Sequence, residues 1–142
     1  MGVRLVAIGL IAGTLWDVFT TFYGVALYFD LPMNPDVNPV QFAFATAVTA
    51  VVFGFVIATH IIWNLKGEDV PSLLLKAVWV ACVAIDLVTS WQGTRRYVFY
   101  GDDGDAGRGV GLAVATALIV SSTIFLSRLV LAKDVRTKPF LF

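Results

Sequence analysis

Residues 17–24 of the chain read DVFTTFYG, and residues 86–93 read DLVTSWQG. Each segment lies inside a long apolar run, yet each carries an acid, two hydroxyls and a glycine at the same spacing. An offset of 69 residues pairs Asp17 with Asp86, Thr20 with Thr89, Thr21 with Ser90, and Gly24 with Gly93. Because the matches fall on polar and small positions rather than on common apolar ones, they indicate a duplicated unit.

The composition around these segments is that of a protein embedded in lipid. Of the 142 residues, 58% are hydrophobic and only 14% are charged, whereas a soluble domain is nearer half apolar and a quarter charged. Four apolar segments are long enough for a helix to cross the ~30 Å hydrocarbon core of a bilayer. They span about residues 3–29, 40–65, 71–100 and 110–132. The sequence therefore predicts an all-α, integral membrane four-helix bundle.

The four segments fall into two tandem helical hairpins. The first hairpin occupies residues 1–68, and the second occupies residues 69–142 together with a short polar tail. The second helices of the two units also align, at an offset of about 70 that places ATAVT (45–49) on ATALI (115–119). Since each unit has two spans, both repeats are expected to have the same orientation in the membrane, related by a pseudo-two-fold axis along the membrane normal.

The polar residues of both motifs are expected to face the inside of the bundle. At 100° per residue the two hydroxyls and the glycine lie on the same face as the acid in each helix. Asp17 lies about 11 residues, or roughly 16 Å, from Tyr28, which places it near the middle of the bilayer. Asp86 has the same spacing from Tyr97. The two carboxyl groups are therefore predicted to face each other or a cavity near the midplane.

Such acids allow two main functions. No Lys or Arg is placed to pair with either acid within the membrane, and Lys76 is ten residues from Asp86. In the first hypothesis the chain is a channel or transporter subunit, and its acids and hydroxyls handle protons or cations. In the alternative it is a non-catalytic structural or assembly subunit of a membrane complex, and protonated acids form interhelical hydrogen bonds. The candidate site residues are Asp17, Thr20, Thr21, Asp86, Thr89 and Ser90, with Gly24 and Gly93 allowing close helix packing.

Several other classes of function are disfavoured by the residue content. The single histidine, His60, lies far from both acids along the helices, so no catalytic residue and no enzymatic activity are predicted. One cysteine and no cluster of ligands give no expectation of a metal or a cofactor. The chain has 10 basic and 10 acidic residues with no basic stripe, which argues against a nucleic acid as a partner.

The distribution of basic residues predicts the topology. The first hairpin loop has no Lys or Arg, and the three arginines near the other hairpin loop are diluted by acids. Most remaining basic residues lie at the opposite helix ends, so both termini are predicted to be cytoplasmic. The expected partners are the lipid bilayer and either further copies of the chain or the other subunits of a larger membrane complex, because four helices enclose little volume.

Overall fold

The computed structural model describes residues 2–65, 69–99 and 106–137, and within these ranges it is entirely α-helical with connecting turns. The helices are α1 (Gly2–Tyr28), α2 (Pro39–Ile57), α3 (Thr59–Asn64), α4 (Val70–Val98) and α5 (Ala106–Thr137). The prediction of an all-α fold is confirmed. The centre of the expected second hairpin loop (100–105), residues 66–68 and the end of the tail (138–142) lie outside the described residues.

Four of these helices are long and apolar enough to cross a membrane. The spans are Leu5–Tyr28, Pro39–Ile57, Val70–Val98 and Gly107–Leu129. Their surface is apolar, with many large side chains such as Leu15 and Leu118 exposed, whereas the buried side chains include two aspartates and eleven hydroxyls. A soluble protein has the reverse distribution, so this one is compatible with a multi-pass membrane protein.

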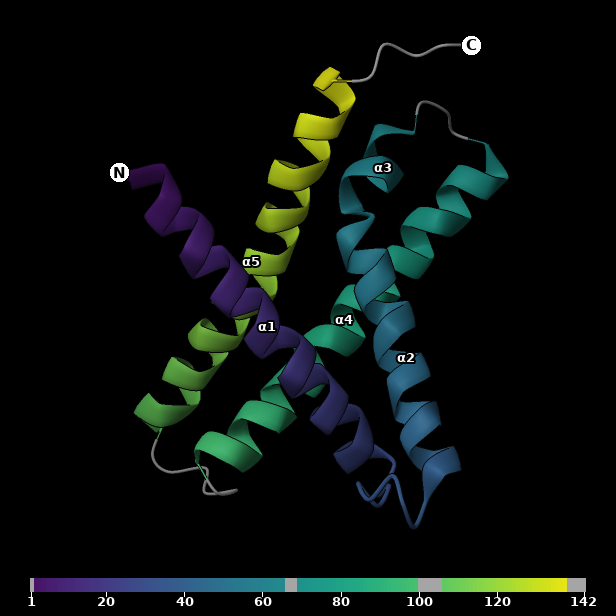
Figure 1. The fold of residues 1–142 in the computed structure, drawn as a ribbon, viewed down its shortest axis with the longest axis vertical. Helices are drawn as coiled ribbons and strands as arrows, with labels where there is room; N and C mark the ends of the chain where they lie inside the picture. The colour runs from purple at the N-terminus through teal and green to yellow at the C-terminus, as the bar shows by residue number, and fades with distance from the viewer. Residues whose placement is uncertain (1, 66–68, 100–105, 138–142) are drawn as a thin grey trace.

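The helices α1 and α4 cross each other at the centre of the bundle, and α2 and α5 flank the crossing (Figure 1). Both α1 and α4 run downward in this view, while α2 and α5 run upward on opposite flanks. The start of α1 and the end of α5 therefore lie at the same end of the bundle, opposite the α1–α2 loop. The most extensive contacts of α1 are with α4 and α5 rather than with its sequence neighbour α2.

The second predicted segment is not one continuous helix. It divides at Ala58, where ψ is 3° and the backbone leaves the α conformation before α3 begins. The hydroxyl of Thr59 donates to the backbone carbonyl of Val56 and accepts a hydrogen bond from Trp79 Nε1 at 2.8 Å. A side-chain hydroxyl that competes for a backbone carbonyl is a common cause of a helix break. The apolar pattern of residues 40–65 contains no Pro at this point, so the break could not be predicted.

Local signals at the helix ends account for the remaining boundaries. Proline occupies the first turn of both α2 and α4, where its missing N–H would have no intrahelical acceptor. At the end of α1, Asp30 has a left-handed φ of 50°. The N–H of Leu31 then donates to the carbonyl of Ala26 at 2.8 Å, which ends the helix in a Schellman-type turn.

Candidate functional site

The carboxyl groups of Asp17 and Asp86 lie at the crossing of α1 and α4, and both side chains are completely buried. Thr21 of α1 donates to Asp86 Oδ1 at 2.6 Å. Ser90 of α4 donates to Asp17 Oδ1 at 2.8 Å. Thr123 of α5 donates to Asp17 Oδ2 at 2.7 Å. Each acid is therefore held by a hydroxyl of the opposite central helix, and Asp17 also by a flanking helix.

The two acids are connected through their hydroxyl partners. Thr21 Oγ1 and Ser90 Oγ lie 3.0 Å apart, so the hydrogen bonds form a continuous chain from Asp86 through Thr21 and Ser90 to Asp17. All four side chains are fully buried. The hydroxyl groups thus satisfy three of the four carboxyl oxygens, which would be very unfavourable in an apolar interior without hydrogen bonds.

Two glycines bring the backbones of α1 and α4 into contact at this crossing. A Cβ added to Gly24 would overlap the backbone carbonyl of Thr89, and a Cβ added to Gly93 would overlap that of Thr20. Backbones approach this closely only where one helix lacks a side chain. The glycines thereby bring the hydroxyls of one helix within reach of the acid on the other.

The structure differs from the simplest sequence expectation about which groups bind each other. Hydroxyls at i+3 and i+4 of an acid share its helix face, but neither Thr20 nor Thr21 donates to the carboxyl group of Asp17, and Thr20 reaches only the backbone carbonyl of that residue, at 3.2 Å. Thr20 donates to the backbone carbonyl of Trp16 at 3.0 Å, and Thr89 donates to that of Ile85 at 2.8 Å. These two threonines therefore bond within their own helices, although Thr20 Oγ1 also lies 3.1 Å from the hydroxyl of Ser90.

Thr123 completes the site and was not among the candidate residues. It lies on the inward face of α5, as Thr116 and Ser127 also do, and all three are buried. The repeat could not reveal it, because the polar motif is confined to the first helix of each unit. The second helices also match differently from the alignment of 45–49 with 115–119. Thr46 is exposed and bonds its own helix at Phe42, whereas its expected counterpart Thr116 is buried.

The second carboxyl oxygen of Asp86 differs from the other three carboxyl oxygens of the pair. Asp86 Oδ2 is buried and has no hydrogen-bond partner among the described residues, whereas both oxygens of Asp17 accept a hydroxyl. The two acids thus have equivalent partners on α1 and α4 but unequal partners on the flanking helices.

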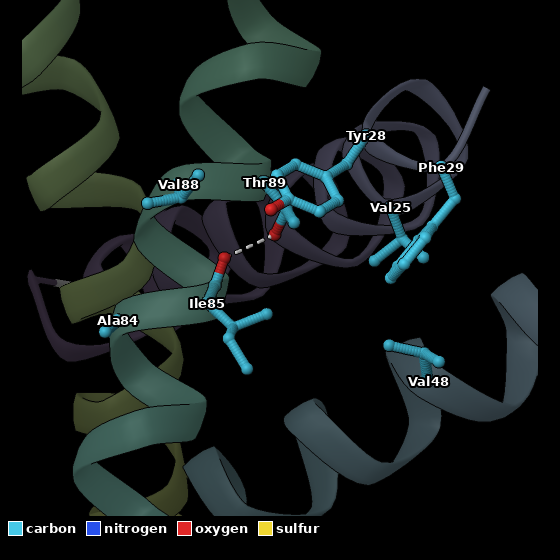
Figure 2. Close-up of a pocket in the computed structure, with 8 residues that line it drawn as sticks. All are labelled: Val25, Tyr28, Phe29, Val48, Ala84, Ile85, Val88 and Thr89. Carbon is cyan, nitrogen blue, oxygen red and sulfur yellow. Dashed lines mark hydrogen bonds between the residues drawn. The ribbon is translucent and has the colours of Figure 1, made fainter.

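An apolar pocket of about 450 Å³ lies beside the crossing, between α1, α2 and α4 (Figure 2). It is lined by side chains such as Val25, Val48 and Ile85, and by Thr89. Figure 2 shows that the Thr89 hydroxyl is occupied by the carbonyl of Ile85. Neither acid lines this pocket, so the pocket is suited to an apolar group rather than to an ion.

Within the residues that the structure describes, the composition of the site differs from that of a metal centre. Within the described ranges, no three His, Cys, Asp or Glu side chains gather where they could hold a metal ion. The polar groups around the acids are hydroxyls, which here act as hydrogen-bond donors to carboxyl oxygens. This chemistry is suited to holding a carboxyl group, or a proton on it, within an apolar bundle.

Comparisons with models of protein families, with curated proteins and with solved structures give no match to the chain.

Proposed function

We propose that the protein is a non-catalytic membrane subunit in which the Asp17–Asp86 pair joins two helical hairpins into one bundle. The observation that carries this proposal is the exchange of hydrogen bonds across the α1–α4 crossing. A hydroxyl of α1 binds the acid of α4, and a hydroxyl of α4 binds the acid of α1. The two hairpins of the chain would be held together by their most polar side chains, at the point where their backbones touch.

The same contacts support a tandem repeat of parallel hairpins. Adding 69 to Thr21 gives Ser90, and adding 69 to Asp17 gives Asp86, so the two hydrogen bonds are equivalent under the repeat. The contact of Gly24 with Thr89 likewise becomes the contact of Gly93 with Thr20. We infer that a pseudo-two-fold axis relates residues 1–68 to residues 69–142 and passes through the crossing.

Complete burial favours this joining role over ion conduction. Both acids have no exposed surface, so a proton or cation could reach them only if the helices separated. Hydrogen bonds between membrane helices contribute about 0.6–2 kcal/mol each. Removing one partner costs more, because it leaves a buried polar group without a hydrogen bond. Such a pair is well suited to specifying how the two hairpins assemble.

Handling of protons or cations is the second candidate function. The unpartnered Oδ2 of Asp86 and the hydroxyl chain between the acids favour it, because a proton can move along connected hydroxyl groups. In this alternative the protein is a channel or transporter subunit, and the described conformation is a closed one.

The exposed apolar faces of all four spanning helices are suited to lipid and to neighbouring subunits. We propose that the chain works as a homo-oligomer or within a larger membrane complex, with both termini in the cytoplasm. Native mass spectrometry of the protein released from mild detergent would test self-association. If only monomers are found at every protein concentration, the homo-oligomer is contradicted and a hetero-complex is the remaining alternative. Affinity purification from the native membrane would test for its other subunits.

One reconstitution experiment separates the two functions. Wild-type protein and the double variant Asp17→Asn/Asp86→Asn are placed in liposomes, and proton and cation fluxes are measured beside thermal stability. The joining role predicts no flux from the wild type and a lower stability of the variant. Wild-type flux that is lost in a folded variant would establish transport instead. Asp36→Asn, in the exposed first loop, is the matched control for loss of an acid.

A further inference from the structure

We propose that the Asp17–Asp86 pair binds a single proton, carried by Asp86, and that Asp17 is the ionised member. This assignment rests on the proposed joining role and adds the distribution of charge within it. The site is then a one-proton site with a defined polarity, although the two acids occupy equivalent positions in the central helices.

The number of hydrogens available to the hydrogen-bonded side chains supports one proton on the Asp17–Asp86 pair. Four contacts connect Asp86, Thr21, Ser90, Asp17 and Thr123 in that order, with oxygen–oxygen distances of 2.6, 3.0, 2.8 and 2.7 Å. Each contact needs one hydrogen, and the three hydroxyls supply three. Two ionised acids would leave one contact with lone pairs facing each other, and two protonated acids would leave one hydrogen without an acceptor. One added proton satisfies every contact.

The neighbouring hydroxyl of Thr20 does not alter this count. Thr20 Oγ1 lies 3.0 Å from the backbone carbonyl of Trp16 and 3.1 Å from the hydroxyl of Ser90, and a contact with Ser90 would bring its own hydrogen, so the balance of contacts and hydrogens is the same in both cases. With the proton on Asp86, the three hydrogens between the two acids all point towards Asp17, and Thr123 donates to Asp17 from the other side. The protonated Asp86 donates to Thr21, which reverses the direction that this contact has when Asp86 is ionised; Thr21 then donates to Ser90, and Ser90 donates to Asp17.

The flanking helices decide which acid carries the proton. An ionised Asp17 accepts two hydroxyl hydrogens, one from Ser90 and one from Thr123. An ionised Asp86 would accept only that of Thr21 and would leave Oδ2 bare in the interior. Hydrogen bonds to a charged oxygen are the stronger ones, and an unpaired buried charge is costlier than an unpaired neutral carbonyl. The proton therefore belongs on Asp86.

Val52 explains why Asp86 lacks the second donor. Trp79 of α4 bonds Thr59 of α3, and α2 and α3 run antiparallel to α4. Seven residues along α4 from Trp79 is Asp86, and seven residues back from Thr59 is Val52, so these two positions lie at the same level. The buried positions agree with this register: Ala45, Thr49, Val52 and Val56 on α2 each precede by 71 residues Thr116, Val120, Thr123 and Ser127 on α5.

By this register, Val52 on α2 occupies the position equivalent to Thr123 on α5. The valine side chain has nearly the same shape as threonine but lacks the hydroxyl. Among the described residues, Asp17 of α1 is the titratable group linked to Asp86 through Thr21 and Ser90, and the buried thiol of Cys82 lies four residues before Asp86 on α4. The flanking helices α5 and α2 contribute Thr123 and Val52, neither of which carries a charge.

Infrared spectroscopy of the full-length protein in lipid nanodiscs, with ¹³C-labelled aspartate, tests the assignment at neutral pH. The wild-type spectrum is expected to contain the carbonyl stretch of one protonated aspartate. That band should disappear in Asp86→Asn, whereas Asp17→Asn should remove intensity from the ionised carboxylate band. Two protonated bands, none, or a protonated band that disappears in Asp17→Asn would each overturn the assignment.

A reciprocal exchange of the flanking residues provides a second test. Val52→Thr gives Asp86 a second donor, and Thr123→Val removes one from Asp17. In the double variant Val52→Thr/Thr123→Val, the protonated band should depend on Asp17 instead of Asp86. If it still depends on Asp86, the flanking hydroxyl does not set the charge and the proposal is wrong. Stability measured on the same samples reports the joining role separately: Asn variants as stable as the wild type would refute the joining role, whereas the assignment of the proton is decided by the spectra alone.

Discussion

Gly24 of α1 packs directly on the backbone of Thr89 in α4, where a Cβ would overlap the Thr89 carbonyl oxygen. The equivalent pair, Gly93 and Thr20, makes the same contact from the opposite helix. Each glycine lies seven residues after the acid of its own helix, and the two contacts fix the separation of the central helices. The polar site therefore depends on two residues that have no polar side chain.

Substitution of either glycine at the crossing should destabilise the bundle. Gly24→Ala or Gly93→Ala would push the backbones of α1 and α4 apart, which is expected to lower the free energy of unfolding by about 1–3 kcal/mol. Gly9→Ala is the matched control on α1, because a Cβ there meets nothing within 4 Å. Reversible unfolding in bicelles or detergent measures the difference. Equal stabilities of Gly24→Ala and Gly9→Ala would contradict the close approach of the two helices.

Loss of the Ser90 hydroxyl should interrupt the connection between the acids. Ser90→Ala removes the donor to Asp17 Oδ1 and the neighbour of Thr21, and it is expected to cost about 1–3 kcal/mol. Thr46→Val is a suitable comparison, because that exposed hydroxyl bonds only its own helix. Chemical denaturation of both variants checks the prediction. If the Ser90→Ala protein is no less stable than Thr46→Val, the hydrogen bonds between Asp86, Thr21, Ser90 and Asp17 contribute nothing to the stability of the fold.

The hydrogen bond between Trp79 and Thr59 should hold the short helix α3 against α4. Trp79→Phe retains the ring contact region but removes Nε1–H, and the expected loss of stability is about 0.5–1.5 kcal/mol. Hydrogen exchange of the α3 amides should increase at the same time. The control is Trp63→Phe, since Trp63 is exposed and packs edge-on against Trp79 without donating to Thr59. Similar exchange in both variants would refute this role.

Single-cysteine labelling tests the membrane topology. Cys82→Ala provides a background without thiols, and Asp36→Cys and Asp69→Cys then place one exposed thiol at each end of the bundle. A membrane-impermeant maleimide added to intact cells should label Cys at position 36, and should label position 69 only after permeabilisation. The reverse pattern would invert the proposed orientation. Labelling of both thiols in intact cells would contradict two loops on opposite sides.

The sequence predicted the helices and the buried acids because both depend on strong local signals. Apolar length defines a membrane span, and two aspartates within such spans must avoid lipid. The identity of the bonding partners was not predictable from helical periodicity, which places Thr21 beside Asp17. The close crossing at Gly24 instead directs Thr21 to Asp86. The contribution of Thr123 and the break at Ala58 depend on tertiary packing that no repeat or apolar pattern encodes.

The partnership of Asp17 with Thr123 has a consequence for the synthesis of the protein. These residues are 106 positions apart, so a ribosome adding about 5–20 residues per second makes the second roughly 5–20 s after the first. During the first part of that interval the first hairpin has neither α4 nor α5 to cover its acid, and after α4 is made it still lacks α5. We expect the nascent hairpin to be retained at the translocon or by an insertion chaperone until the last helix arrives, and to be degraded when translation stops before it.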